Sequence, residues 1–146
     1  MIWGKYTWVM FHTLAEKIRD DMFDSHKHVI FDVILSLCSC LPCPTCKIHA
    51  AETLKKKNIR EARTKHELKM FLYQFHNTVS HRKGMPTPDM RVLAQYEHGN
   101  LRRIVQAFRQ HFVTTTPSLM SEQLKRKRVI ARCMDTLNRN WHVFDN

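Results

Sequence analysis

The sequence predicts an all-α protein. Glycine is scarce, at 3 of 146 residues, and apolar residues recur at helical spacing along nearly the whole chain. No stretch alternates apolar and polar residues convincingly in the way that a half-buried strand requires. A chain of this length forms one domain, or one domain with an appendage, and it can bury a proper core.

Three helices are expected in the first part of the chain. The first covers about 3–20 and carries an apolar stripe, and a break at 21–25 ends at Ser25, a plausible N-cap. The second helix follows and stops at Pro42, because proline lacks the N–H that a continuing helix needs. The third opens at residues 43–46 and runs to about residue 58.

The second part of the chain contains clearer helix boundaries. A fourth helix is expected over about 64–81, where Thr64 and Glu67 form a capping box. Residues 84–88 contain a glycine and two prolines and should break the chain. A fifth helix begins at Asp89 with an interruption at 99–100. Residues 114–118 are the best candidate for a linker, and a last helix covers about 119–139.

Composition limits the classes of function. The formal net charge of +11 favours attraction to nucleic acid, acidic proteins or anionic cofactors, without choosing among them. The N-terminus lacks the pattern of a signal peptide, and the longest apolar stretch, 29–37, is too short to span a bilayer. We therefore expect a soluble protein made where thiols are kept reduced. Its five cysteines then indicate catalysis or metal binding rather than a disulfide framework.

The most informative stretch is the CxxC sequence formed by Cys43 and Cys46, with Pro42 and Pro44 beside Cys43. The prolines place the two cysteines on the first turn of a helix, where free N–H groups and the helix dipole stabilise a thiolate. The pattern predicts a dithiol with a lowered pKa that can close into a small, reactive disulfide. Half of a zinc knuckle has the same sequence, so the pattern alone leaves both chemistries open.

Two other groups of residues could bind a ligand. Gly4, Trp8 and His12 follow one another at four-residue steps and share one helix face. That face suits an aromatic ligand that carries phosphate, although a core tryptophan and a hydrogen-bonded core histidine would give the same pattern. His49 lies three residues after Cys46, beside it on the same helix.

The fourth helix supplies the second group. His76 and Asn77 end its apolar stripe, and Arg82 and Lys83 follow. These side chains could contact the edge of an adenine or a pyrophosphate, or they could form an ordinary solvated helix end. A CxxC dithiol needs a redox cofactor nearby to pass electrons to oxygen at useful rates. Three helices that present histidine or aromatic side chains toward one dithiol make a plausible flavin site.

Taken together, these motifs resemble the Erv/ALR family of FAD-dependent sulfhydryl oxidases over about residues 1–96. The compact form is similar to the versions encoded by large cytoplasmic DNA viruses. The motifs that carry the resemblance occur in order: Trp3-Gly4 with Trp8 and His12, Leu41-Pro42-Cys43-Pro44-Thr45-Cys46 with His49, and His76-Asn77-Thr78-Val79.

The resemblance implies a four-helix bundle around FAD with a short fifth helix, a homodimer, and the reaction 2 R-SH + O2 → R-S-S-R + H2O2. The implied partners are a thiol-bearing protein or thioredoxin-like relay and molecular oxygen, and the implied location is the host cytoplasm or the virion. Cys43 would exchange with incoming thiols, and Cys46 would lie against the isoalloxazine ring. No metal ligand is implied. The implied FAD contacts are Gly4, Trp8, His12, Cys46, His49, His76, Asn77, Val79, Ser80, Arg82, Lys83 and Tyr96.

This chain departs from the family pattern at several places. Ser80 replaces the usual asparagine, and Met85 replaces a common lysine, whose phosphate contact Arg82 or Lys83 could take over. The family's structural cysteine pair at the end of the third helix is absent. Residues 99–146 have no family counterpart, so we divide the chain into an oxidase core, 1–98, and a basic helical C-terminal extension.

The remaining cysteines leave alternatives open. Cys38 and Cys40 could form a relay pair, although two residues apart on a helix they point away from each other, and Cys133 has no neighbour in the sequence. Cys38, Cys40 and the CxxC pair with His49 could instead bind zinc. A basic nucleic-acid-binding protein is a further alternative, based on the net charge and the run 125–128, but it is not favoured because such a run is more often a solvated surface.

Overall fold

The structure, a computed structural model, describes residues 2–112 and 119–145, and within them it contains helices and no strand. The expected all-α class is therefore confirmed. The α-helices are α1 (Ile2–Lys17), α2 (Asp20–Cys38), α3 (Pro44–Lys56), α4 (Lys65–Arg82), α5 (Leu101–Phe112) and α6 (Met120–Arg139). Three short 3₁₀ helices join or follow them: η1 (Ile59–Glu61), η2 (Met90–His98) and η3 (Trp141–Val143).

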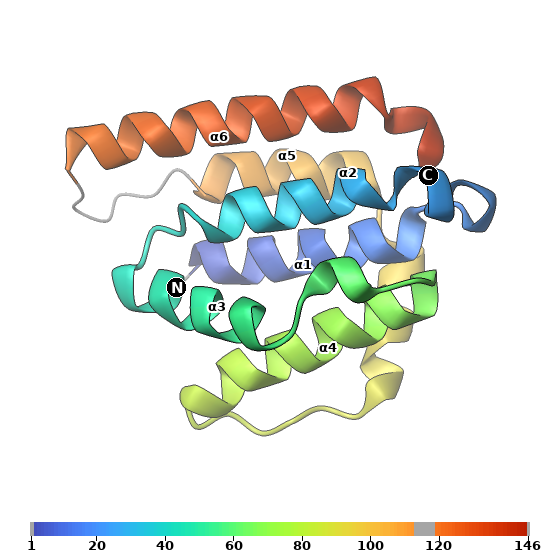
Figure 1. Cartoon of the computed structure of the whole chain (residues 1–146), viewed down its shortest axis with the longest axis horizontal. Coiled ribbons are helices and arrows are strands. Elements are labelled where there is room, and N and C mark those ends of the chain that lie inside the picture. Colours follow the sequence, from blue (N-terminus) through green and yellow to red (C-terminus); the bar gives the residue numbers. More distant parts are fainter. Residues whose placement is uncertain (1, 113–118, 146) are drawn as a thin grey trace.

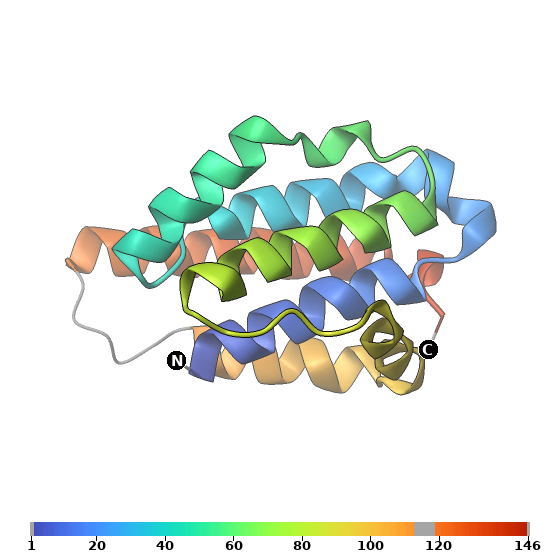
Figure 2. The same cartoon turned by 90° about the horizontal axis from the view of Figure 1, so that it is seen from below.

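Helix α1 is the centre of the molecule. It contacts α2, α4, α5 and η2, and in Figures 1 and 2 it runs between α4 on one side and α5 on the other. Its second half is buried almost all round, and Met10, Leu14 and Ala15 are fully inaccessible to solvent. A helix that is apolar on most of its faces must be enclosed by others. The remaining helices thus assemble around α1.

The first boundary differs from the sequence expectation. Helix α1 ends at Lys17 and α2 begins at Asp20, so the expected break at 21–25 and the N-cap at Ser25 are wrong. Asp20 and Asp21 occupy the first turn of α2, where carboxylates stabilise the positive end of the helix dipole. The C-terminal segment holds the short connection: the Arg19 N–H donates to the Val143 carbonyl at 2.8 Å. The second helix also ends before Pro42, at Cys38.

Helix α4 follows the sequence prediction closely. The Thr64 hydroxyl accepts a hydrogen bond from the Glu67 N–H at 3.1 Å, as a capping box requires. The Glu67 carboxylate accepts from the Arg63 N–H, one residue before the expected partner. At the other end Gly84 adopts φ 73°, and the Met85 N–H returns to the Ser80 carbonyl at 3.0 Å. Glycine tolerates this left-handed conformation, so the helix stops there.

The C-terminal extension packs against the rest of the chain. The interruption expected at 99–100 separates η2 from α5, and Phe108 and Phe112 of α5 are fully buried. Trp3 packs edge-on against Phe112 with ring centroids 6.1 Å apart. Helix α6 lies along α2 (Figure 1). The expected linker, 114–118, falls outside the described residues. No helix of the described chain has the length and apolar composition needed to cross a membrane.

Candidate active site

The dithiol lies at the N-terminus of α3, as the sequence predicts. Cys43 is the N-cap residue, Pro44 is the first helical residue, and Cys46 is in the first turn. The Cys46 backbone N–H donates to the Cys43 sulfur, with N and Sγ 3.2 Å apart. Both side chains are half-buried free thiols. Negative charge on the Cys43 sulfur is therefore stabilised by a helix N–H and by the dipole of α3.

The expectation that both thiols have a lowered pKa is wrong for Cys46. Burial and, to a lesser extent, the neighbouring Cys43 together raise the pKa of the Cys46 thiol to about 11, although Lys83 opposes the shift. The Cys46 N–H donates to the Cys43 sulfur, whereas the Cys46 side chain lines a pocket of mostly apolar residues. The two sulfurs thus have different environments: Cys43 is suited to exchange with thiols, and reduced Cys46 keeps its proton.

Aromatic side chains from different helices stack beside this dithiol. The Trp8 indole of α1 and the His76 imidazole of α4 lie with their planes 7° apart and their centroids 4.2 Å apart. The His12 ring stacks on Tyr96 of η2 at 4.8 Å, and His12 Nε2 lies 3.0 Å from His76 Nδ1. The motifs of the first and fourth helices therefore form one cluster, as expected for a common ligand site.

Both histidines of this cluster are neutral at pH 7. Burial lowers the pKa of His12 to about 3, and the charge of His76 lowers it further. Burial also lowers the pKa of His76, to about 4, with a contribution from Lys83. The hydrogen bond between the two rings therefore has one donor and one acceptor. His12 Nδ1 is buried and has no hydrogen-bond partner among the described residues. Buried polar atoms are nearly always hydrogen-bonded, so an unpaired one indicates a partner outside the described chain.

A pocket opens between this cluster and the dithiol, with about 440 Å³ of empty space that includes its open mouth. Five residues expected from the sequence line it or its rim: Gly4, Trp8, Cys46, Val79 and Lys83. A side chain at Gly4 would meet no atom within 4 Å, which marks open space on that face of α1. Of the stacked cluster, Trp8 lines the pocket with Cys46, whereas His12, His76 and Tyr96 do not line it.

Sequence reasoning missed several residues of the pocket wall. Phe75 and Phe11 line it, and both belong to apolar helix stripes that had been assigned to the core. Cys38 lines it as well, although its side chain is buried. The signal for Phe75 was its position directly before His76. No pattern in the sequence distinguishes a phenylalanine that faces a pocket from one that faces the core.

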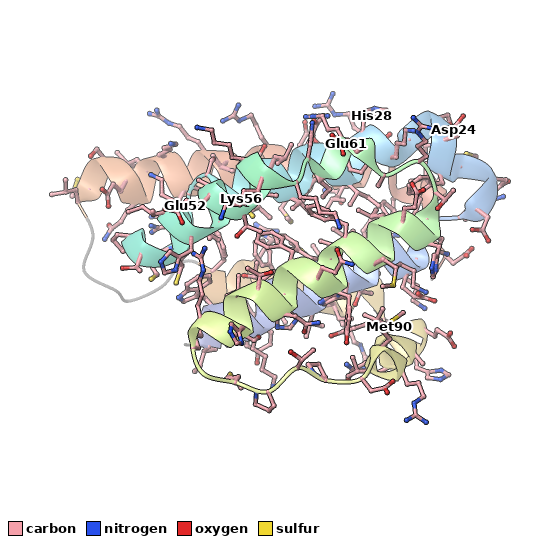
Figure 3. All side chains as sticks on the ribbon, turned by 60° about the horizontal axis from the view of Figure 1, so that its bottom comes forward. Asp24, His28, Glu52, Lys56, Glu61 and Met90 are labelled. Atoms are coloured by element: carbon pink, nitrogen blue, oxygen red, sulfur yellow. The ribbon has the colours of Figure 1, made fainter. Side chains whose placement is uncertain are left out.

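Other expected cofactor contacts do not line this pocket. His49 is half-buried on α3, one turn after Cys46, and Asn77 and Ser80 are half-buried on α4. Arg82 lies 3.5 Å from the Glu52 carboxylate (Glu52 is labelled on α3 in Figure 3). It lines a second cavity between α3 and α4, together with Lys56 and Lys57. Phe75 borders both cavities, so the two lie on either side of one ring.

The residues present fit a flavin. The pocket beside Cys46 has flat aromatic walls and few polar groups, which is how proteins bind a large aromatic ring. Trp3 Nε1 and His12 Nδ1 are buried without partners in the described structure and can hydrogen-bond to such a ligand. The second cavity, with Lys56, Lys57 and Arg82, offers positive charge for phosphates. These properties suit an aromatic cofactor that carries a pyrophosphate.

The other cysteines occupy separate environments. Cys38 lines the pocket beside Cys46, while Cys40 lines a groove on the other side of the loop, so the two face apart as expected. Burial raises the pKa of Cys38 to about 12 and that of Cys133 to about 11. Among the described residues, no three histidine, cysteine or acidic side chains are placed to hold a metal ion. The zinc alternative therefore has no geometric support there.

The fold and this site together define a class of protein: a small helical thiol-redox protein whose CxxC pair opens onto a pocket for an aromatic cofactor. The comparison with known families agrees. The model of the Erv1 / Alr family matches residues 5–100, so the chain belongs to that family. The family expected from the sequence motifs is confirmed, and the match ends before α5 begins.

Two viral proteins are similar to this chain. One is the fowlpox virus protein named probable FAD-linked sulfhydryl oxidase, 25% identical over 77 residues, which are 53% of this chain and 77% of that protein. Another is the putative FAD-linked sulfhydryl oxidase 096R of invertebrate iridescent virus 3. It is 28% identical over 86 residues, and the match spans 58% of each chain. No solved structure matches the chain significantly.

Proposed function

We propose that this protein is an FAD-dependent thiol oxidase that makes disulfides in protein substrates through Cys43 and Cys46. The observation that carries the proposal is the position of Cys46. Its side chain lines a pocket with aromatic walls, while Cys43 is the N-cap of the same helix. Family membership and the names of the two viral relatives support the same activity.

The chemistry begins at Cys43. A substrate thiolate attacks Cys43 Sγ of the Cys43–Cys46 disulfide, the bond between the two protein sulfurs breaks, and Cys46 takes the electron pair. A second substrate thiolate attacks the substrate sulfur of the mixed disulfide, and Cys43 leaves as a thiolate. The hydrogen bond from the Cys46 N–H, seen at 3.2 Å, stabilises that leaving group. The substrate leaves as a disulfide, and the protein holds two electrons.

Bound FAD supplies the two-electron acceptor and the link to oxygen, from which hydrogen peroxide forms. The protein orients this group by stacking and hydrogen bonding. Trp8, which stacks on His76, would contact its aromatic part, and neutral His12 could offer Nδ1 to it. Lys83 places a positive charge at the rim of the pocket. Burial raises the pKa of reduced Cys46, so this sulfur would have to lose its proton before it could donate electrons to a bound acceptor.

The assignments of individual residues follow from their places. Gly4, Trp8, His12, Cys46, His76, Val79, Lys83 and Tyr96 surround the cofactor in this proposal, and His49, Asn77, Ser80 and Arg82 contact its remaining parts. Residues 1–98 form the oxidase core in this proposal and 99–146 its C-terminal extension, whose helices α5 and α6 contact α1 and α2 respectively. A homodimer and a location in the host cytoplasm are part of the proposal, on the resemblance alone. A nucleic-acid role is not favoured, because Arg126 of the basic run is buried.

An absorbance spectrum with an oxygen electrode tests the function. The purified protein should be yellow, with a flavin band near stoichiometric occupancy, and should consume oxygen when dithiothreitol is added. The variant Cys46→Ser should keep the colour and lose the oxygen consumption. A colourless protein that retains its helical circular dichroism after addition of FAD would contradict the proposal. Zinc analysis of the same sample separates the metal alternative.

A further inference from the structure

A further groove lies next to the segment that carries Cys43, and it is distinct from the aromatic pocket and from the cavity between α3 and α4. This groove encloses about 500 Å³, open to solvent on one side, between the loop that precedes α3 and the first turns of α6. Leu41, Pro42 and Pro44 form the loop wall, and Pro42 and Pro44 are the two neighbours of Cys43. Helix α6 forms the other wall and lies beyond the part of the chain that matches the family.

The groove is bordered by a buried cation. Arg126 of α6 is 5% exposed, and its Nε–H donates to the Cys40 carbonyl at 3.0 Å. No carboxylate of the described chain lies within 4.0 Å of Arg126. A buried charge is costly unless an opposite charge compensates it, and a guanidinium suits a carboxylate because it can donate two parallel hydrogen bonds. The groove therefore favours the binding of an anionic group beside Arg126.

Further positive charge surrounds the same place. Lys47 of α3 and Lys125 of α6 line the groove, and Glu122 is the one acidic residue of its described wall. Burial raises the pKa of the Cys40 thiol, and Arg126, Lys125, Lys47 and Arg132 all oppose that shift. Cations from two helices thus act on one point of the loop. The local field is therefore positive at Cys40, three residues before Cys43 in the same segment.

We propose that this groove binds an acidic segment of the protein substrate, next to the cysteine that attacks Cys43. The inference rests on the proposed thiol-oxidase function and adds a substrate class to it: thiol proteins with aspartate or glutamate beside the reactive cysteine. The bound segment brings the substrate sulfur to Cys43, and Arg126, Lys125 and Lys47 contact its carboxylates. The groove itself takes no part in the transfer of electrons.

An acidic peptide fits this groove better than nucleic acid does. The opening has room for a few side chains and lies against proline and leucine, which suit an extended peptide. The groove is also lined by both sequence neighbours of Cys43, a residue that only a thiol partner needs to approach. Geometry and charge together therefore favour an acidic peptide as the partner.

Binding of redox-inactive peptides tests the proposal apart from turnover. The first peptide carries serine in place of cysteine between flanking aspartates, and its twin carries asparagine in place of each aspartate. We expect the acidic peptide to bind the oxidised holoenzyme about tenfold more tightly than the twin in low salt, by isothermal titration calorimetry. In the double variant Lys47→Gln, Lys125→Gln this preference should fall below about threefold.

A matched control removes the same charge from the same helices. Lys55 of α3 and Lys127 of α6 are exposed and do not line the groove. The double variant Lys55→Gln, Lys127→Gln should retain the preference of the wild-type protein. An equal loss of this preference in both double variants would mean that the attraction comes from the overall positive charge. That result would overturn the groove as the binding site. A short DNA strand that displaces the acidic peptide from the groove, with an affinity sensitive to Lys47 and Lys125, would overturn the choice of partner.

Kinetics separates this proposal from the proposed function. Cysteine forms of both peptides are compared with dithiothreitol as the reference substrate of the same wild-type preparation. We expect kcat/KM for the acidic peptide to exceed that for its twin about tenfold, with the difference removed by salt. Oxidation of dithiothreitol with no preference between the peptides would refute the groove and leave the oxidase intact. Failure to oxidise dithiothreitol would refute the oxidase, while the calorimetry would still decide the groove.

Discussion

The indole of Trp8 and the imidazole of His76 lie parallel, with ring planes 7° apart and centroids 4.2 Å apart, although they come from α1 and α4. This contact brings together two motifs that are far apart in the sequence. Cys46 reaches the same pocket from α3. The site therefore depends on the relative placement of three helices, and small losses of packing between them should affect cofactor binding first.

Trp8→Ala should weaken FAD binding about tenfold or more, because it removes one of the two indole rings that line the pocket. Trp8→Phe should retain most of the binding. The ratio of flavin to protein absorbance after gel filtration measures both. Trp141→Ala is a matched control, since Trp141 belongs to η3 and stacks under Arg102 at 4.6 Å rather than lining the flavin pocket. Equal loss of flavin in that control would show a general loss of stability instead.

Cys46→Ser should reduce dithiol oxidation by about 100-fold or more, because the electron pair then has no sulfur in the pocket. The same variant should trap a mixed disulfide when the substrate is supplied in its disulfide form, because the Cys43 thiolate attacks that disulfide, releases a substrate thiolate and has no Cys46 to resolve the product. Non-reducing electrophoresis and mass spectrometry detect the adduct. Cys43→Ser should also be inactive but should trap no adduct at residue 43. A stable substrate adduct on Cys46 of the Cys43→Ser variant would mean that the roles are reversed.

The thiols of the reduced protein should react with iodoacetamide in a defined order at pH 8. Thiolates are the reacting species, and burial raises the pKa of Cys38 to about 12 and that of Cys46 and Cys133 to about 11. Cys43 should therefore be labelled first, about tenfold or more ahead of Cys133. Time-resolved peptide mass mapping measures the order. Labelling of Cys133 at the rate of Cys43 in folded protein would contradict its burial.

The free energy of unfolding should fall as the pH is lowered from 7 to 5. The pKa of His12 is about 3 in the folded protein against an ordinary value of 6.5, so the unfolded chain binds more protons between these values. Protonation of His12 in the unfolded chain should by itself lower the free energy of unfolding by about 2 kcal/mol at pH 5. Urea unfolding of the cofactor-free protein at several pH values measures the slope. The slope should decrease in His12→Gln, and an unchanged slope would exclude His12 as its source.

Phe108→Ala should destabilise the protein by about 3–5 kcal/mol, because Phe108 is fully buried beside Phe112 and its loss leaves a cavity. Leu124→Ala on the exposed side of α6 should cost less than about 1 kcal/mol. Denaturant midpoints of both variants test whether the extension belongs to the cooperative core. A small effect of Phe108→Ala would mean that α5 unfolds separately from α1.

Local signals in the sequence were sufficient for most helix boundaries. Thr64 with Glu67 starts α4, Gly84 ends it, and the prolines around Cys43 start α3, because each acts through its own backbone or its near neighbours. The sequence prediction placed the start of α2 too late, after an expected break at 21–25, whereas the helix begins at Asp20. Its connection to α1 is held by hydrogen bonds to the far C-terminal segment, such as Arg19 to Val143, and no local pattern contains that information.

By itself, the sequence determined the all-α class, the dithiol at a helix N-terminus and the family, since each depends on residue types at short spacing. Only the tertiary structure decided which environment each sulfur has. Burial raises the pKa of Cys46, and Cys38 joins its pocket while Cys40 lies beside Arg126 of α6. These properties come from desolvation and from charges on other helices, and both depend on distances in the folded chain.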